Sequence, residues 1–261
     1  RRGAAQSAWQ IRVAASASKL AAGDAELWDS GRVTGHATNQ IAYAGRALVS
    51  RTECFWQVQI WDELDPASGW SASSRWSMGL LKPEDWRAEW ISHRDEEALH
   101  TDRKTLHLPA PRTYRKEFTT GKTVKRAVVY ASALGIYDLY CNGQRVGDAY
   151  FQPGWSDYLQ RAYYRSHDVT ALLRSGGANA LGAVVAEGWY SGYLGYALLV
   201  GYGPNKVGRY FYGKTPAFAA QLEIDYADGT HERVITDGSW QVTEPDGGAT
   251  RAGLAILDRL G

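Results

Sequence analysis

The chain has 261 residues, enough for one large domain or two ordinary domains that each bury a core. Its 29 lysine and arginine residues nearly balance 28 aspartate and glutamate residues, so the charge argues against nucleic acid or an anionic membrane as a partner. The 11 Trp and 16 Tyr, set against 5 Phe, favour half-exposed sheet surfaces, because both side chains combine an apolar face with a hydrogen-bonding edge. Such faces also stack on sugar rings, but we expect most of them to fill the cores of β-domains.

The cysteines and the start of the chain give little information on its compartment. Cys54 and Cys141 lie in separate strand-like runs on either side of the domain boundary inferred below, so we expect no disulfide. No run approaches the roughly 18 apolar residues of a membrane span. The first residues, Arg1 to Gln6, contain no apolar signal core, and the sequence therefore names no compartment.

The first 81 residues are predicted to form a small β-domain. Apolar and polar residues alternate with the period of a β-strand, and Gly-rich or polar turns separate the runs. The expected strands are Trp9–Val13, Leu27–Gly31, Gln40–Tyr43 and Cys54–Trp61. We expect a short helical turn near Ala17–Leu27. The domain is predicted to end at Leu81, because the segment 81–86 contains a proline and resembles a linker.

The second domain, residues 82–242, is also predicted to be all-β. Its expected strands are Tyr114–Phe118, Arg126–Ser132, Ile136–Cys141, Tyr163–Arg165, Asn179–Ala186, Ala217–Tyr226 and Arg233–Thr236. Asn142-Gly143 predicts a two-residue hairpin turn, because both residues accept a positive φ, and Asp228-Gly229 predicts a second one. Asp168 is expected to cap a single helical turn that Gly176-Gly177 ends.

The alternating run at 217–226 suggests how this domain is layered. One face carries apolar side chains, namely Phe218, Ala220, Leu222, Ile224 and Tyr226. Gln221, Glu223 and Asp225 point the other way, as in a strand with one face in water. Two stacked antiparallel sheets of jelly-roll type are the expected architecture.

An irregular segment from His93 to Pro111 precedes these strands. It contains His93, His100 and His107, but their spacing matches no compact ligand motif, so we predict an exposed crossing loop and no metal site.

The stretch from Arg126 to Tyr196 resembles the N-terminal β-sandwich domain of the bacterial α-L-rhamnosidase family. The motifs that carry the resemblance are Gly135-Ile136-Tyr137, Asn142-Gly143 with Val146-Gly147-Asp148, Pro153-Gly154-Trp155-Ser156-Asp157-Tyr158, Asp168-Val169-Thr170, Asn179-Ala180-Leu181-Gly182 and Gly188-Trp189-Tyr190. The segment from Lys214 to Trp240 continues it.

The stretch from Gln6 to Leu81 resembles the fibronectin-III-like module that precedes this domain in the family. The chain departs from the family at both ends. The resemblance implies a strand before Gln6 that this sequence lacks, so we expect the strand at Trp9–Val13 to expose unpaired backbone and to favour a homo-oligomer. Beyond Val242, residues 243–261 are a tail that no longer resembles the family's strand and linker.

The resemblance also implies what the chain lacks. In the family an (α/α)₆ barrel follows and holds the general acid and base of this glycoside hydrolase. None of the barrel is present, so no catalytic residue is assigned and enzymatic activity of this chain is left open. The expected role is that of a non-catalytic module that braces the catalytic barrel and binds rhamnose-containing glycans.

The glycine-rich segment Gly188–Tyr196 is the candidate carbohydrate-binding surface. Trp189, Tyr193 and Tyr196 would stack on sugar rings, while Asp157 or Glu187 would hydrogen-bond to ring hydroxyls. Two alternatives stay open, namely that these aromatic side chains dock on the barrel or that they pack in the core.

A stand-alone hydrolase that uses a surface carboxylate pair is the alternative function. Glycosidases need two carboxyl groups about 5 to 9.5 Å apart, and Asp157, Asp168 and Glu187 are the candidates beside the aromatic segments. The sequence contains no G-x-S-x-G, H-E-x-x-H or Walker motif, and we predict no cofactor.

Overall fold

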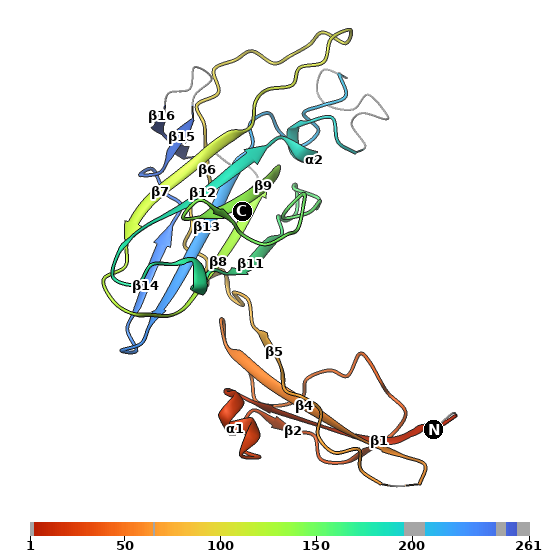
Figure 1. Cartoon of the computed structure of the whole chain (residues 1–261). Coiled ribbons are helices and arrows are strands. Elements are labelled where there is room, and N and C mark those ends of the chain that lie inside the picture. The colour runs from red at the N-terminus through yellow and green to blue at the C-terminus, as the bar shows by residue number, and fades with distance from the viewer. Residues whose placement is uncertain (1–2, 65, 196–206, 244–248, 255–261) are drawn as a thin grey trace. The chain divides into compact units, whose positions relative to one another are not determined.

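The computed structural model describes residues 3–64, 66–195, 207–243 and 249–254. It is nearly all β, and the chain divides into two compact units, Arg1–Trp86 and Arg87–Gly261 (Figure 1). Within the described part of the chain, no helix is long and apolar enough to cross a membrane.

All the strands described in the first unit belong to one antiparallel sheet. The strands are β1 (Gln6–Ala14), β2 (Trp28–Asp29), β3 (Val33–Thr34), β4 (Glu53–Asp62) and β5 (Ser74–Ser77). Their order is β2-β1-β4-β5, and β3 pairs with β1. The helix α1 (Ala17–Ala21) follows β1, and the Ser16 hydroxyl caps it by accepting from the Lys19 N–H.

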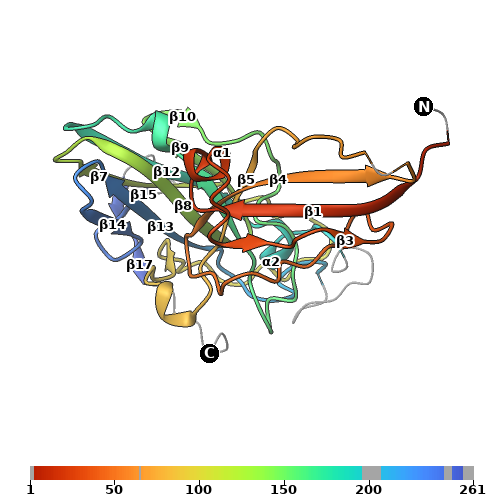
Figure 2. The same cartoon turned by 90° about the horizontal axis from the view of Figure 1, so that it is seen from below.

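Strand β1 is an interior strand, so the expectation that it exposes unpaired backbone is wrong. It pairs with β4 along one side and with β2 and β3 along the other, where Arg12 lies opposite Asp29 and Trp9 opposite Val33 (Figure 2). The short strands β2 and β3 together cover the edge that a missing strand was expected to leave open. The basis for association through β1 is thereby removed.

The predicted strand Gln40–Tyr43 does not form. Gln40 has a φ of 55°, and the Tyr43 ring packs against Trp28 of β2 and Trp76 of β5, at centroid distances of 5.4 and 6.2 Å. Since β2 and β5 lie at opposite edges of the sheet, this segment crosses the sheet instead of pairing with it. The Tyr43 hydroxyl holds it there, with the carbonyl oxygens of Leu27 and Arg46 at 3.0 and 2.8 Å.

The described residues of the second unit form two six-stranded antiparallel sheets. One has the order β10-β9-β12-β7-β15-β16, and its strands are β7 (Arg112–Thr119), β9 (Ile136–Cys141), β10 (Gln144–Arg145), β12 (Ala178–Ala186), β15 (Gln241–Thr243) and β16 (Ala249–Arg251). The other has the order β11-β8-β13-β6-β17 with β14 on β13, and its strands are β6 (Ile91–Ser92), β8 (Val124–Leu134), β11 (Tyr164–Asp168), β13 (Ala217–Tyr226), β14 (His231–Ile235) and β17 (Gly253–Leu254).

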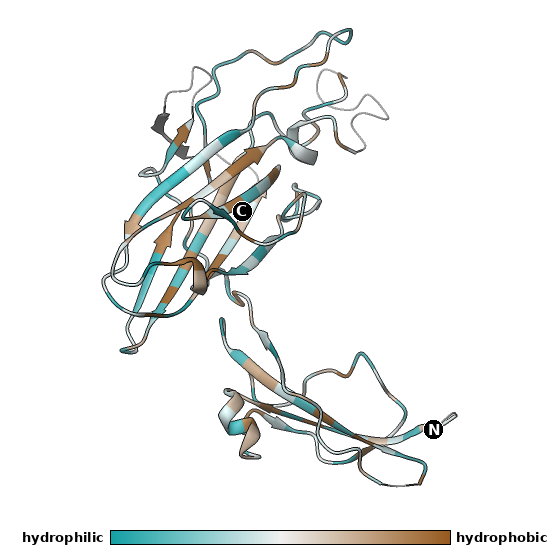
Figure 3. Cartoon of the chain, viewed as in Figure 1, coloured by the Kyte–Doolittle hydropathy of each residue, from teal (hydrophilic) through white to brown (hydrophobic). Residues whose placement is uncertain are grey.

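The two sheets pack face to face around one core. Tyr114 of β7 and Phe218 of β13 meet across it at 6.2 Å, and Trp240 is fully buried beside Phe218. Buried and more exposed positions alternate along β12, as the two-residue period of a strand requires, and hydrophobic residues occur along the strands of both sheets (Figure 3). The predicted two-layer β-sandwich is confirmed for this unit.

The turns agree with the sequence in part. Asn142 and Gly143 have φ values of 50° and 80° and join β9 to β10, which confirms the predicted hairpin. At Asp228-Gly229 only Gly229 has a positive φ, so that prediction is wrong in detail. Asp228 instead accepts hydrogen bonds from the backbone and side chain of Thr230.

The face of β13 that was predicted to be wet is largely buried. Gln221 and Glu223 are 0% and 1% exposed. The Gln221 side chain accepts from the Arg87 N–H at 2.6 Å, and Glu223 bonds to Arg233 on β14 at 2.6 Å. Polar residues therefore occur at buried positions here because neighbouring strands and the start of the unit supply their partners.

The tail beyond Val242 also differs from the prediction. Strand β15 extends to Thr243, β16 pairs with it, and β17 pairs with β6. Ala252, between β16 and β17, is buried in the core. The last described residues therefore add one strand to each sheet.

Candidate functional site

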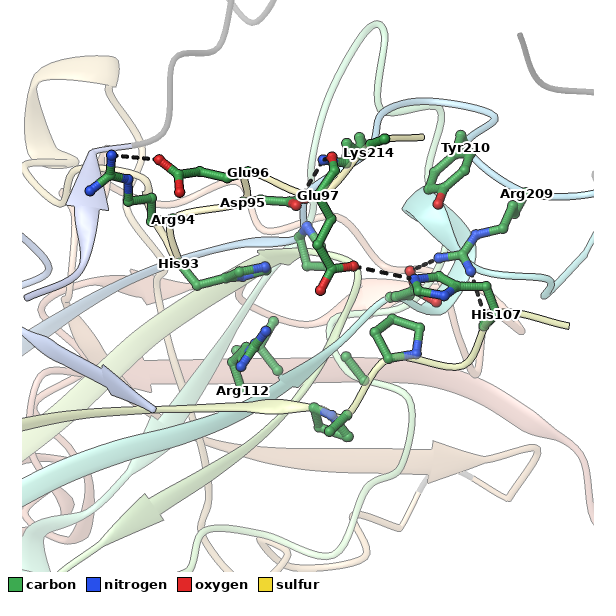
Figure 4. A pocket seen from close by; sticks show the side chains of 18 of the residues that line it. His93, Arg94, Asp95, Glu96, Glu97, His107, Arg112, Arg209, Tyr210 and Lys214 are labelled. Atoms are coloured by element: carbon green, nitrogen blue, oxygen red, sulfur yellow. Dashed lines mark hydrogen bonds and ion pairs between the residues drawn. The ribbon is translucent and has the colours of Figure 1, made fainter. Parts of the chain in front are cut away.

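A cavity of about 550 Å³ lies at one end of the second unit (Figure 4). Its walls come from four segments that are far apart in the sequence, namely residues 93–98, 107–114, 185–187 and 209–216. The first two flank the crossing between β6 and β7, the third ends β12, and the fourth precedes β13. The ends of strands from both sheets thus position its lining.

Glu187 enters the cavity directly after β12, where Gly188 turns the chain. Gly188 has a φ of +50°, and a side chain there would meet Ile136, with a Cβ 2.7 Å from its Cγ2. The conformation of Gly188 therefore fixes where the Glu187 side chain lies. The short helix α2 (Gly188–Ser191) begins at this point, so the glycine-rich segment is partly helical and not only a loop.

Arg209 is the buried cation that faces Glu187. Its side chain is 1% exposed, and its Nη2 donates to the Glu187 carboxylate while its Nη1 donates to the His107 carbonyl oxygen. The guanidinium group also stacks on Tyr210, 4.3 Å from the ring centroid. Burial raises the pKa of Glu187 to about 7; Arg209 opposes this rise and Asp95 adds to it.

A second ion pair joins Asp95 to Lys214. Lys214 Nζ lies 2.7 Å from Asp95 Oδ1, and the Thr215 hydroxyl donates to Asp95 Oδ2 at 2.7 Å. Burial acts to raise the pKa of Asp95, but the hydrogen bonds from Lys214 and Thr215 outweigh it, and the pKa lies below its ordinary value. Asp95 is therefore a charged acceptor at neutral pH.

The three histidines of the crossing segment do not come together as a metal site. His107 lies 3.7 Å from Glu97 and stacks on His100, while His93 lines the cavity. Burial and the nearby Arg209 lower the pKa of His107. Within the described ranges, no group of three or more His, Cys, Asp or Glu side chains is placed to hold a metal ion.

The residues proposed for sugar binding fall into two places. Glu187 lines the cavity, and Tyr193 lies beside it, because its hydroxyl accepts from the His107 N–H at 3.0 Å and its ring lies 5.2 Å from the Arg209 guanidinium. Trp189 belongs to a neighbouring aromatic cluster and packs edge-on against Phe151 at 6.0 Å. Tyr196 lies outside the described residues.

Asp157 and Asp168 are engaged in local turns. Asp157 is exposed and accepts from the Leu159 N–H at 3.1 Å and from the Gln160 side chain. Asp168 accepts from the N–H of Thr170, the first residue of the helical turn η2 (Thr170–Leu172), but the N-cap of this turn is Val169, so the predicted capping role of Asp168 is wrong in position. Neither lines the cavity with Glu187, so the geometry does not favour the carboxylate trio of the alternative hydrolase.

Sequence reasoning did not identify Asp95, Arg209 or Lys214 as site residues. The segment that contains Asp95 was predicted to be an exposed loop, and Arg209 lies in a run without periodicity. The available signal was the local sequence, because Arg209 follows a glycine-rich segment and is itself followed by the aromatic residues Tyr210, Phe211 and Tyr212. Its burial against Glu187 depends on contacts between distant segments.

Two family models match the chain. The model described as the α-L-rhamnosidase N-terminal domain matches residues 122–253, and that described as the Rha78A-like, N-terminal immunoglobulin domain matches residues 1–82. The second description gives the immunoglobulin type, which shares its sandwich architecture with fibronectin type III. The fibronectin-III-like type therefore stays a prediction.

Curated relatives agree with these matches. An α-L-rhamnosidase of Alteromonas sp. (strain LOR) is 37% identical over 242 residues, which is 92% of this chain and 25% of the relative. One from Formosa agariphila is 36% identical over 91% of this chain and 24% of the relative. The chain thus spans about a quarter of the length of these relatives.

Solved structures give the same result. An α-L-rhamnosidase from Dictyoglumus thermophilum aligns with a TM-score of 0.78 and 30% identity, over 93% of this chain and 26% of that one. The Streptomyces avermitilis α-L-rhamnosidase complexed with L-rhamnose aligns with a TM-score of 0.77 and 27% identity, over 92% of this chain and 38% of that one. From its sequence matches and its fold, this chain belongs to the α-L-rhamnosidase family and carries the N-terminal domains of that family.

Proposed function

We propose that these two domains are non-catalytic accessory modules of an α-L-rhamnosidase-like glycoside hydrolase, and that the second domain braces the catalytic barrel. The observation that carries this proposal is an exposed apolar surface between β10 and β11. Its members are Tyr150, Phe151, Trp155, Leu159 and Tyr163, whose exposed fractions run from 46% to 77%. Large exposed apolar side chains that gather in one segment are typical of interaction surfaces.

The aromatic cluster behind this surface supports a docking role. Tyr158 is buried and packs edge-on against Tyr190 and Tyr212, and Phe151 contacts Trp189. Packing against this cluster therefore restricts the motion of the exposed side chains, which reduces the entropy lost when a partner binds them. The partner we propose is the remainder of the same enzyme, because the matched relatives are about four times as long as this chain.

Mixing the chain with the remaining three quarters of the Alteromonas relative tests the bracing role. We expect the two to sediment as one complex, and Trp155→Ser with Phe151→Ser to weaken it. Glu117→Gln, an exposed change on β7, is the matched control. Complex formation that is absent, or that is indifferent to the two aromatic changes, contradicts the proposal.

We further propose that the region of α2 binds rhamnose-containing glycans weakly. Trp189, Tyr193 and Tyr196 would supply stacking faces, and Asp157 or Glu187 would hydrogen-bond to hydroxyls. The half-buried Trp189 supports this role, as does the position of Tyr193 against Arg209, the partner of Glu187. A site on one face of a sugar is expected to bind in the millimolar range, which corresponds to about 4 kcal/mol.

An NMR titration with L-rhamnose tests this second role. The indole N–H of Trp189 should shift as the sugar is added, and Trp189→Phe, which removes this indole, assigns the signal. An indole signal that stays fixed up to high sugar concentration excludes Trp189 as a stacking face.

A further inference from the structure

The cavity beside Glu187 has the dimensions of a ligand site. Its volume of about 550 Å³ lies within the range of roughly 300–1,000 Å³ that is common for small-molecule pockets. Several of its charged side chains are held in place by ion pairs, so the polar groups are fixed before a ligand arrives (Figure 4). Such preorganisation lowers the cost of binding.

The charges of the lining cancel. Four cationic side chains, Arg94, Arg112, Arg209 and Lys214, face four acidic ones, Asp95, Glu96, Glu97 and Glu187. The net charge is zero when Glu187 is ionised and +1 when it is protonated, so the lining gives little field that would attract a polyanion or a polycation. Closely spaced donors and acceptors suit a neutral ligand with many hydroxyl groups, because each hydroxyl both donates and accepts.

Arg209 carries a buried donor whose acceptor is not found among the described residues. Its side chain is buried and lines the cavity, yet its Nε has no hydrogen-bond partner among the described residues. A buried donor without an acceptor is costly and is uncommon in native structures. Because the Arg209 side chain is only 1% exposed, a ligand hydroxyl can accept from Nε only when the side chain shifts towards the cavity.

We propose that this cavity binds one ring of a neutral sugar, with hydroxyls that donate to Asp95 and Glu187 and accept from Arg209 and Lys214. The inference rests on the glycan-binding role proposed above, but it locates the sugar in the cavity and not on the face of Trp189. Asp95 and Lys214 thereby become binding residues that the aromatic site does not include. Recognition is by hydrogen bonds to charged groups, which discriminate strongly against ligands that lack a hydroxyl.

Two NMR reporters in one titration separate the cavity from the aromatic face. The Arg209 Nε–H reports on the cavity, and the Trp189 indole N–H reports on the aromatic surface. The whole chain is titrated with L-rhamnose, D-mannose and the anionic sugar D-glucuronate. We expect the neutral sugars to shift the Arg209 signal and to bind more tightly than D-glucuronate.

Matched substitutions identify the contacts. Asp95→Asn removes a charged acceptor and should weaken the binding of the neutral sugar about tenfold. Lys214→Gln should act in the same direction and provides a second test if Asp95→Asn impairs folding. Glu117→Gln removes an acid outside the cavity and should leave the affinity unchanged.

Each outcome decides between the proposals. A shift at Arg209 that Asp95→Asn or Lys214→Gln weakens supports the cavity. A shift at Trp189 alone, insensitive to both changes, overturns the cavity and retains the aromatic site. A shift at neither reporter with any sugar overturns both binding sites, while the bracing role is decided separately by sedimentation. Tighter binding of D-glucuronate overturns the preference for a neutral ligand.

Discussion

Glu187 is subject to two opposed influences at a single carboxyl group. Burial favours its neutral form, whereas the contact with Arg209 favours its charged form, and the pKa of about 7 reflects the greater effect of burial. Because the ordinary value is 4.5, the folded state binds a proton more strongly than the unfolded state between pH 4.5 and 7. The free energy of unfolding therefore falls as the pH rises through this window.

Substituting Glu187 by Gln should remove this pH dependence. We compare the free energies of unfolding of Glu187→Gln and of the wild type. The value for the variant minus that for the wild type should increase by up to about 3 kcal/mol between pH 4.5 and pH 7, and it should stay constant above pH 7. Urea unfolding at a series of pH values measures this difference. The control Glu117→Gln shows the effect of removing an exposed carboxyl group. A difference that decreases with rising pH contradicts the assignment.

Gly188 is the backbone feature that places Glu187. Gly188→Ala should cost about 2–4 kcal/mol, because it combines a left-handed backbone with a Cβ that clashes with Ile136. The control Gly176→Ala has a similar φ of +67° but no atom within 4 Å, and should cost only about 1 kcal/mol. Thermal unfolding measures the loss of stability in each variant relative to the wild type. Equal losses in the two variants would show that the Ile136 side chain moves aside without an energetic penalty.

At the scale of elements, regular strands were the most predictable feature. The alternating runs around Val58 and Leu222 predicted β4 and β13, because successive side chains of a strand point to opposite faces, although in β13 both faces are buried. Tyr43 was predicted in a strand because the run Gln40–Tyr43 lies between polar turns at the spacing of a small sandwich, but its contacts with two tryptophans hold it across the sheet. The pairing of Glu187 with Arg209 was not predictable, since no local pattern links residues on distant segments.

The short strands β16 and β17 extend both sheets after a segment that the sequence left unassigned. A chain that ends at residue 248 loses them and uncovers the edges of β15 and β6. We expect the free energy of unfolding of the second unit to fall by roughly 2–4 kcal/mol, since each hydrogen bond between paired strands contributes about 1 kcal/mol. Calorimetry should show this against a control that ends at Leu254, and equal stability of the two chains would mean that β16 and β17 contribute little.

At the scale of the whole molecule, self-association should depend on the exposed aromatic surface and not on β1. Sedimentation of the wild type at micromolar concentration should show a dimer or larger species, and Phe151→Ser with Trp155→Ser should shift it towards monomer. Ile11→Lys tests the alternative, because Ile11 lies on the interior strand β1. Dissociation by Ile11→Lys without loss of folding would restore a role for β1.

We propose that these domains support the remainder of the enzyme and bind sugar without hydrolysing it. Asp157 and Asp168 are occupied in turns, and Glu187 is paired with Arg209, so no carboxylate pair among the candidates is arranged for hydrolysis. The direct test is to measure the release of an aryl group from an aryl α-L-rhamnoside by the purified chain. We predict no turnover above the blank, and turnover that purifies with the protein and disappears in Glu187→Gln would contradict the account.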